Sequence, residues 1–301
     1  KKLMKEKFLE NGVACPWFAG VDSLEDLCSY VSVKSSRTFV LKPIDGRGAR
    51  GVLLIDSNTN LAWAYSESKR WGDCGRLILE EFIPGLQLST ESFIRQGVCY
   101  TAAIAERNYS RLEQFAPNII EDGGTIPALI DSELKVKIDE LILKGARALG
   151  IYEGIVKGDI VIDSEGKPLI IELAARLSGG WFATHQVPAA TGIDLVEAVI
   201  SYSLGEEVSP QSLMPTRNNA TAIRYWFPPQ GRVQSIDGEL DLQDIPGLLS
   251  YGFFRDVGDR QPEIKMHSDR FGYVIIKGKN REDVINHVNN ALACINIEIM
   301  P

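Results

Sequence analysis

The chain has 301 residues, of which 45% are hydrophobic and 24% charged, and its formal net charge at pH 7 is −8. This apolar content excludes a disordered chain, and the length predicts two or three domains whose cores need no disulfide or structural metal. Because nucleic-acid backbones require an excess of Lys and Arg, the acidic balance argues against nucleic acid as the main partner. It leaves open small anions, which need only a local positive pocket.

The first third of the chain alternates short helices with strands. In order, the predicted elements are helices over 1–11 and 24–31, strands over 37–42 and 51–56, a helix over 61–69 and a strand over 76–82. Gly12 follows the first helix where a C′ glycine is typical, and Ser23 is placed to cap the second. This part of the chain therefore predicts a small mixed lobe.

The remaining two thirds combine hairpins with amphipathic helices. In order, we expect a hairpin over 88–95 and 98–105, a polar loop over 108–125, a helix over 131–149, a hairpin over 154–163 and 168–173, a helix over 194–204, strands over 220–226 and 270–277, and a helix over 281–295. The polar segment 209–219 contains two prolines and is interpreted as a domain boundary. Because most strands form hairpins rather than regular βαβ units, the predicted fold class is α+β.

Five cysteines are scattered along the chain, at Cys15, Cys28, Cys74, Cys99 and Cys294. They are odd in number and form no C-x-x-C pair, so a thiolate zinc site is not expected. No run approaches eighteen apolar residues, and the charged first ten residues do not resemble a signal peptide. We therefore expect reduced thiols, a cytoplasmic location and no membrane partner.

A glycine-rich loop, Asp45–Gly51, contains the pattern G-x-G-x-x-G. A dinucleotide-binding site requires a helix after this pattern, whereas a strand follows here, and neither G-x-x-x-x-G-K-[ST] nor the HRD and DFG motifs of protein kinases occur. Glycines let several amides point at one anion, and Lys42, Arg47 and Arg50 add positive charge. The loop favours a flap over polyphosphate, the alternative being a glycine-rich hairpin with solvated arginines.

Two acidic residues, Asp159 and Glu172, lie in neighbouring predicted strands among apolar residues. Two such acids together suggest a shared cation, and Mg²⁺ prefers carboxylates combined with substrate phosphates. The alternative is a solvent-facing strand with alternating acids. Arg176 and the following Ser178–Gly180 suit a carboxylate or a developing oxyanion, although Arg176 is equally suited to pair with one of the acids.

Together these segments resemble the ATP-grasp superfamily, on the side of the carboxylate–amine ligases related to biotin carboxylase, carbamoyl-phosphate synthetase and the L-amino acid ligases. The matching segments, in the family's order, are residues 1–13, 39–43, 45–52, 77–85 with Ser89 and Glu91, and 170–180. The resemblance extends to about Leu204. It implies an ATP-grasp fold, in which two α+β lobes clasp ATP, followed by a small C-terminal α+β domain.

The resemblance also implies roles for individual residues. ATP would be bound by Lys1, Lys42, Gly46, Arg47, Gly48, Arg50, Gly51, Glu80, Glu81, Phe82, Ile83 and Glu91, with residues 80–83 as the hinge that holds adenine. Mg²⁺ or Mn²⁺ would be bound by Asp159 and Glu172. The catalytic residues would be Arg176, Lys42, Ser178 and Gly179. The implied reaction joins a small carboxylate to an amine through an acyl phosphate, giving an amide or peptide bond.

Two positions depart from the family pattern. Gln87 stands where an acid often contacts ribose, and Ala174 replaces an asparagine that often binds the metal. The segment ELAARLSGG nevertheless resembles the amino-acid ligases more than biotin carboxylase. Two alternatives therefore stay open, namely activation of bicarbonate, as in carboxylases or carbamoyl-phosphate synthesis, and a nucleotide-binding module without ligase activity.

The expected organisation is a linking helix at 1–15, a small lobe with the flap at 16–83, a large lobe with the metal site at 84–208 and a C-terminal α+β region at 209–301. Family members usually carry a further α/β lobe ahead of the Lys1 position, so we expect that lobe to be absent from this chain. Small-molecule substrates are the expected partners, with homodimerisation left open. In the C-terminal region, Arg224 is a candidate for contacting a substrate.

Overall fold

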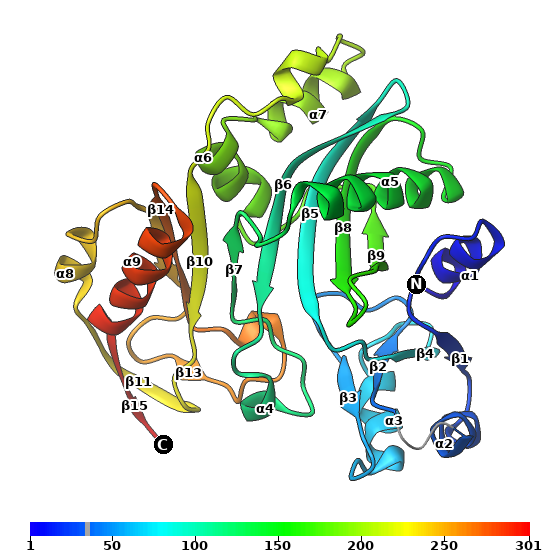
Figure 1. Ribbon diagram of the computed structural model, residues 1–301. Helices are drawn as coiled ribbons and strands as arrows, with labels where there is room; N and C mark the ends of the chain where they lie inside the picture. Colours follow the sequence, from blue (N-terminus) through cyan, green and yellow to red (C-terminus); the bar gives the residue numbers. More distant parts are fainter. Residues whose placement is uncertain (34–36) are drawn as a thin grey trace.

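The computed structural model describes residues 1–33 and 37–301. Within these residues the strands form sheets of four, eight and three strands, and all their pairings are antiparallel. Figure 1 shows the four-stranded sheet at the lower right and the C-terminal region at the left of the view, where its strands β10, β14 and β12 continue the large sheet. The mixed, antiparallel architecture agrees with the predicted α+β class.

The small lobe has the strand order β1-β4-β2-β3. Its elements are α1 (Lys2–Glu10), β1 (Phe18–Val21), α2 (Leu24–Val33), β2 (Phe39–Pro43), β3 (Leu53–Ile55), α3 (Leu61–Lys69) and β4 (Leu77–Glu81). Ser23 caps α2 as predicted, because its Oγ accepts the Asp26 N–H at 3.1 Å. Phe8 of α1 is fully buried in the core of the large sheet, so α1 connects the two lobes.

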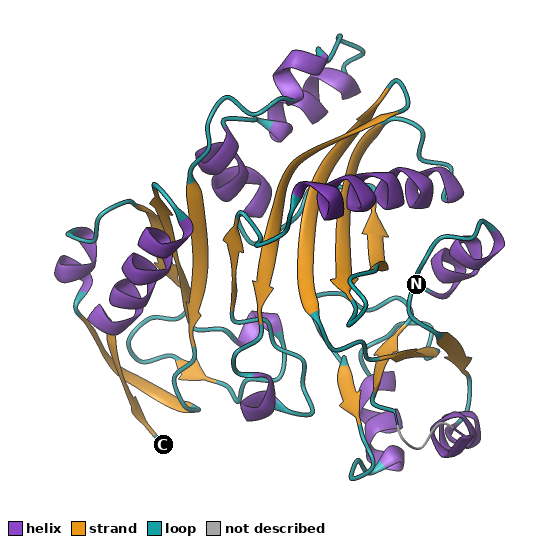
Figure 2. Cartoon of the chain, in the orientation of Figure 1, coloured by secondary structure: helices purple, strands orange, loops and turns teal. Residues whose placement is uncertain are grey.

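The large sheet has the order β12-β14-β10-β7-β6-β5-β8-β9. Its elements up to residue 213 are β5 (Leu86–Arg95), β6 (Val98–Asn108), α4 (Leu112–Phe115), β7 (Gly123–Ile126), α5 (Ser132–Ala148), β8 (Gly154–Ile162), β9 (Pro168–Ala174), η1 (Phe182–Gln186), α6 (Val187–Thr191), α7 (Leu195–Ser203) and η2 (Pro210–Leu213). Figure 2 shows α5 crossing the strands of this sheet. Ile138 and Ile142 of α5 are fully buried against it, which leaves the polar side of the helix in solvent.

The predicted loop over 108–125 is wrong in part, because it contains α4 and most of β7. Its adjacent glycines, Gly123 and Gly124, disfavour a strand by propensity. In the structure Gly123 is needed for close approach, since a Cβ there would lie 2.2 Å from the Ile223 carbonyl oxygen. The neighbouring strand β10 (Ala220–Trp226) supplies the pairing that local sequence does not reveal.

The large sheet continues across the boundary predicted at 209, because β10 pairs with both β7 and β14. The elements of the C-terminal region are β10, β11 (Gly231–Asp237), α8 (Glu239–Gln243), β12 (Leu248–Phe253), β13 (Arg260–Gln261), η3 (His267–Asp269), β14 (Gly272–Gly278), α9 (Arg281–Cys294) and β15 (Asn296–Met300). Helix α9 packs on β10 and β14 through Val284, Val288 and Ala291. This continuity fixes the C-terminal region beside the large lobe.

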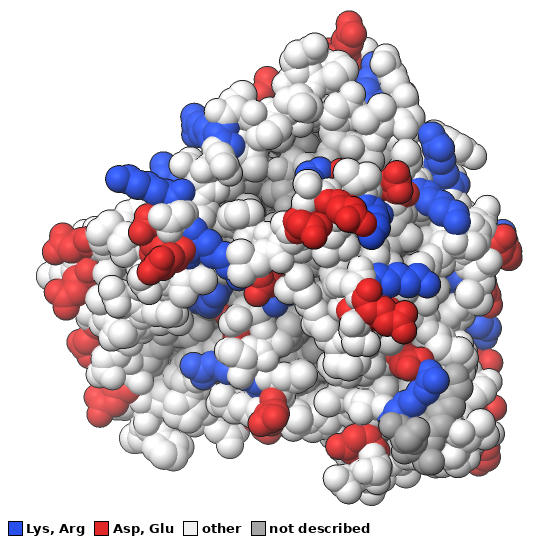
Figure 3. All heavy atoms as spheres, viewed as in Figure 1, with Lys and Arg blue, Asp and Glu red and all other residues white. Residues whose placement is uncertain are grey.

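The outer surface carries both signs of charge. Figure 3 shows acidic and basic side chains interspersed over the face it draws. Among the described residues, no helix combines the length and the apolar character needed to cross a membrane.

Candidate active site

A cavity of about 850 Å³ lies between the small lobe, the large sheet and the C-terminal region. Most of the residues predicted to bind nucleotide, bind metal or act in catalysis line it: Lys1, Lys42, Gly46, Arg47, Gly48, Arg50, Glu80, Glu81, Phe82, Ile83, Asp159, Glu172, Arg176, Ser178 and Gly179. Segments far apart in sequence therefore meet at one concave site of a size suited to a small-molecule ligand. Gly51 and Glu91 are the two predicted residues that do not line it.

Gly51 has a structural reason for being glycine. Its φ is +65°, and a Cβ would lie 2.9 Å from Trp71 Cδ1. Its carbonyl oxygen accepts the Ser68 hydroxyl at 2.7 Å, which fastens the end of the loop to α3. Gly51 therefore anchors the loop, and the residues ahead of it face the cavity.

The phosphate lysine predicted on β2 is part of a buried charge triad. Lys42 Nζ lies 2.8 Å from Glu80 Oε1, and Lys5 Nζ lies 3.1 Å from Glu80 Oε2. Burial would raise the pKa of Glu80, but the two ammonium groups lower it, so its carboxylate is charged. Burial lowers the pKa of Lys5, with Glu80 opposing this effect. The Glu80 side chain thus holds two lysines, and the adenine contact implied for residues 80–83 stays a prediction.

The glycine loop is hydrogen-bonded both to Lys1 and to the C-terminal region. Lys1 Nζ donates to the Gly46 carbonyl oxygen at 2.5 Å, and the His267 N–H donates to the Gly48 carbonyl oxygen at 3.3 Å. Gly48 and Ala49 both have φ near +60°, a left-handed conformation that re-aims successive peptide groups. The loop consequently spans from the small lobe to the C-terminal region.

The two acids predicted to bind metal, Asp159 on β8 and Glu172 on β9, are cross-strand partners. Asp159 accepts the Ser89 hydroxyl at 2.9 Å and is paired with Lys157 and with Arg107, the latter at 3.3 Å. Burial would raise the pKa of Asp159, but Lys157 and Arg107 hold it well below the usual range. The carboxylate is therefore charged at every pH at which the protein is expected to work.

Two carboxylates fit Mg²⁺ when substrate phosphates complete its coordination. No group of three or more His, Cys, Asp or Glu that could hold a metal occurs in residues 1–33 and 37–301. The donor set therefore suits a hard ion that arrives with a polyphosphate, and does not suit an all-protein metal site.

Glu91, predicted to contact nucleotide, instead supports the loop that follows β9. Its side chain is fully buried, and its two carboxylate oxygens accept the Ser178 N–H at 3.0 and 3.3 Å. Burial raises the pKa of Glu91 to about 7, and the hydrogen bond from Ser178 opposes that rise. Because the Ser178 N–H is already donated, Gly179 and Gly180 are the remaining amides of this loop for binding an oxyanion.

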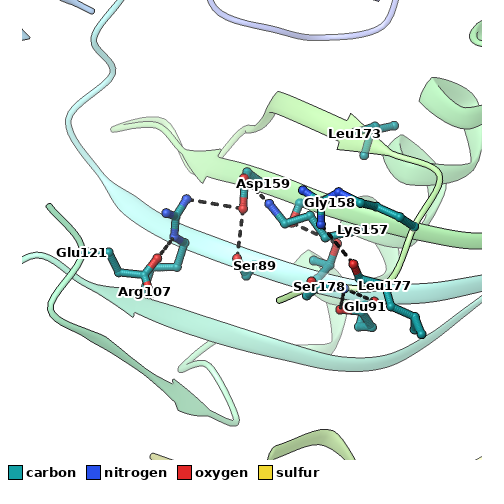
Figure 4. Close-up of polar contacts among 12 residues, drawn as sticks. Ser89, Glu91, Arg107, Glu121, Lys157, Gly158, Asp159, Leu173, Leu177 and Ser178 are labelled. Atoms are coloured by element: carbon teal, nitrogen blue, oxygen red, sulfur yellow. Dashed lines mark hydrogen bonds and ion pairs between the residues drawn. The ribbon is translucent and has the colours of Figure 1, made fainter. Parts of the chain in front are cut away.

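A chain of ion pairs that lines the cavity was not predicted from the sequence. Arg107 on β6 donates from Nε to Glu121 at 2.7 Å and also reaches Asp159, which pairs with Lys157 (Figure 4). Arg107 directly precedes the segment 108–125 that was predicted as a loop, and Glu121 lies within it. Lys157 precedes Asp159 by two and so lies on the same face of β8. That i, i+2 spacing is the one signal that the sequence offers for Lys157.

The C-terminal region contributes Tyr225, His267 and Arg270 to the cavity. Arg224, the residue singled out from this region, does not line it. Its guanidinium donates to the Gly124 and Ile223 carbonyl oxygens at 3.1 and 2.8 Å, because the strand pairing turns it toward β7. The prediction for Arg224 is therefore wrong, and its neighbour Tyr225 points to the cavity instead.

Comparison with known proteins agrees with this geometry. The ATP-grasp domain family matches residues 1–180, and the L-amino acid ligase C-terminal domain 2 family matches residues 224–300. The chain therefore belongs to the ATP-grasp family, as the sequence motifs predicted.

Several relatives are distant. The chain is 21% identical over 265 residues to biotin carboxylase 2 of Bacillus subtilis (strain 168), covering 86% of this chain and 58% of that protein. It is 26% identical over 176 residues to D-alanine–D-alanine ligase of Parvibaculum lavamentivorans, covering 57% of this chain and 54% of that protein. The chain thus spans between half and three fifths of the length of these curated relatives.

Solved structures share the fold. The L-amino acid ligase from Bacillus licheniformis superposes with a TM-score of 0.83 at 21% identity, covering 100% of this chain and 72% of that one. A biotin carboxylase complex from Campylobacter jejuni gives a TM-score of 0.70 at 17% identity, covering 98% of this chain and 66% of that one. The ATP-grasp fold predicted from the sequence is confirmed.

Proposed function

We propose that this ATP-grasp protein is an ATP-dependent carboxylate–amine ligase that forms an amide or peptide bond through an acyl phosphate. One observation carries the proposal: Lys1 and Lys42, the glycine loop, and the pair Asp159 and Glu172 all line a single cavity. Cations and amides suit the phosphates of ATP, and paired carboxylates suit Mg²⁺. The match of residues 224–300 to an L-amino acid ligase domain supports an amino acid as one substrate.

In the first step, a substrate carboxylate attacks the γ-phosphate of ATP, and ADP leaves. Lys42 stabilises the negative charge on the transferred group, and Glu80 keeps its ammonium in place. The amides of the loop from Gly46 to Arg50 cover the phosphates and exclude water. When bound by Asp159 and Glu172, Mg²⁺ supplies additional charge neutralisation at the phosphates.

In the second step, an amine attacks the acyl carbon, and inorganic phosphate leaves. The tetrahedral oxyanion needs donors that are fixed before the reaction. Arg176 and the amides of Gly179 and Gly180 are available, and Glu91 holds the start of that loop through the Ser178 N–H. The reaction requires no side-chain nucleophile, because the substrate carboxylate and the amine are themselves the nucleophiles. The charged side chains of the cavity then serve to bind and orient them.

Release of ADP tests the proposal. The protein is incubated with ATP, Mg²⁺ and paired amino acids, with bicarbonate in place of the carboxylate as a second arm, and amide products are identified by mass spectrometry. We expect ADP and amide in equal amounts with at least one pair, and loss of both in Lys42→Met but not in the surface variant Lys69→Met.

Bicarbonate-dependent ADP release would favour a carboxylase-type activity, for which the extent of the match to biotin carboxylase 2 is the supporting observation. ADP release that neither a carboxylate nor an amine stimulates would favour a nucleotide-binding module. Either result would refute the ligase activity.

The proposal also keeps the predicted division of the chain into domains, namely residues 1–15, 16–83, 84–208 and 209–301.

A further inference from the structure

Arg270 is a buried cation at the end of the cavity formed by the C-terminal region. It follows η3 directly, is only 7% exposed and lines the cavity. Its guanidinium lies over the ring of Tyr225 at 3.8 Å, and one terminal nitrogen donates to the Glu121 carbonyl oxygen at 2.5 Å. Its Nε–H has no hydrogen-bond partner among the described residues.

The other buried cations of the cavity are already neutralised. Lys42 pairs with Glu80, Lys157 with Asp159, and Arg107 with both Asp159 and Glu121. Among the described residues, the carboxylate oxygen paired with Arg270 is Glu121 Oε1, which is 3.9 Å away, and the other oxygen of that carboxylate already pairs with Arg107. A buried guanidinium with an unpaired N–H is unfavourable on its own, so Arg270 is poised for an anionic ligand.

Arg270 belongs to a different part of the fold from Lys42, the lysine proposed to bind phosphate. Among the described residues, ion pairs connect Arg270 to Asp159 through Glu121 and Arg107, whereas Lys42 and Glu80 belong to the small lobe. Its stacking partner Tyr225 reaches the loop after β9, since a Cβ on Gly180 would lie 3.4 Å from the Tyr225 hydroxyl. An anion on Arg270 is therefore close to the loop proposed to bind the oxyanion, and is distinct from the carboxylate that is phosphorylated.

An unpaired acceptor lines the same cavity. Gln186, the last residue of η1, is 2% exposed, and its Oε1 has no hydrogen-bond partner among the described residues. His267 beside Arg270 is neutral, because burial lowers its pKa to about 3, so it adds no second positive charge. A guanidinium with an unpaired N–H together with a neutral acceptor matches a ligand that carries one carboxylate and one amine.

We propose that Arg270 binds the carboxylate of the amine-donating substrate, which is therefore an amino acid, and that it determines the preference for amino acids over neutral amines. This inference rests on the ligase activity proposed above. A planar guanidinium that is fixed by stacking suits bidentate contact with a carboxylate, and the free Nε–H is one of the two donors required.

The test compares amino acids with their amides as the amine substrate. ADP release is measured for the wild type, Arg270→Gln, Arg270→Lys and the control Arg232→Gln, which removes an exposed arginine of the same region. In the wild type we expect the free acid to be preferred. In Arg270→Gln we expect kcat/KM for the acid to fall about 10- to 100-fold, kcat/KM for the amide to change less than about threefold, and the KM for ATP to stay unchanged.

Arg270→Lys keeps the charge and should recover part of the preference, which a purely structural role of Arg270 would not explain. Equal use of acid and amide by the wild type, or an unchanged preference in Arg270→Gln, would overturn the inference. If no pair of substrates yields ADP, the ligase proposal fails by itself.

The Arg270 subsite is then tested by thermal unfolding, as the rise in Tm that each of the twenty amino acids produces in the presence of a non-hydrolysable ATP analogue. A rise that Arg270→Gln abolishes and that the amides do not produce supports the subsite, and its absence from the wild type refutes it.

Discussion

Replacing Glu91 by Gln tests the connection between a buried carboxyl and the loop after β9. The pKa of Glu91 is raised from 4.5 to about 7, with burial as the largest cause. A change of this size corresponds to about 3 kcal/mol of free energy. Because the folded state binds this proton more tightly than the unfolded state, the contribution of Glu91 to stability is fully present below pH 4.5 and is lost as the pH rises through 7.

Glutamine keeps the size of Glu91 and one acceptor for the Ser178 N–H, but it does not titrate. We therefore expect the unfolding free energy of Glu91→Gln, minus that of the wild type, to increase by about 3 kcal/mol between pH 4.5 and pH 8. Urea unfolding at five pH values measures this difference, in which the titrations common to both proteins cancel. Glu282→Gln, a change at an exposed carboxylate, serves as the control and should give a flat difference.

A difference curve for Glu91→Gln that stays within about 0.5 kcal/mol of a constant, or that falls with pH, would refute the reasoning. It would mean that the carboxyl is solvated or that the hydrogen bond from Ser178 outweighs burial. The same variant should also reduce kcat more than it raises the KM for ATP, since Glu91 bonds to the loop after β9 and does not line the cavity.

Three further predictions concern the triad, the acids and the loop. Glu80→Gln leaves Lys5 buried without a carboxylate and should lower the unfolding free energy by about 3–5 kcal/mol, and adding Lys5→Met should restore at least half of it in urea titrations. No loss in the single variant would contradict the triad. Asp159→Asn should raise the Mg²⁺ concentration needed for half-maximal ADP release at least tenfold, and an unchanged requirement would remove Asp159 from the metal site. Trypsin should cleave after Arg47 or Arg50 in the free protein and at least fivefold more slowly with a non-hydrolysable ATP analogue, because nucleotide holds the loop closed. Equal rates would count against a flap.

The sequence predicted those parts of the fold that strand patterns and turns between neighbouring residues determine. The hairpin that carries Asp159 and Glu172 follows from two apolar strands around a tight turn, and the structure pairs these residues directly. Strand β7 was missed because Gly123 has a low strand propensity, and its reason for being glycine is the approach of β10, almost a hundred residues later. Where long-range pairing decides the conformation, propensity is a weak guide.

For the candidate site too, local sequence signals were informative and long-range contacts could not be predicted. Lysines, glycines and acids in a known order predicted most of the residues that line the cavity. The roles of Glu80 and Glu91 could not be read from their order, because the partners that define them, Lys5 and Ser178, lie 75 or more residues away. Arg107 and Arg270 were missed for a related reason, since each acquires its environment from strands that meet only in the folded sheet.

The pairing of β10 with β7 has a functional consequence. It places Tyr225 and Arg270 in the wall of a cavity whose other walls come mainly from residues 1–186. The His267 N–H, three residues before Arg270, donates to the Gly48 carbonyl oxygen in the loop that is proposed to cover the phosphates. Closure of that loop and the position of Arg270 therefore share one segment. If Arg270 binds the amine-donating substrate as proposed, occupation of its subsite should slow the tryptic cleavage of the loop beyond the effect of nucleotide alone. A substrate that leaves the cleavage rate unchanged would show that the two ends of the cavity act independently.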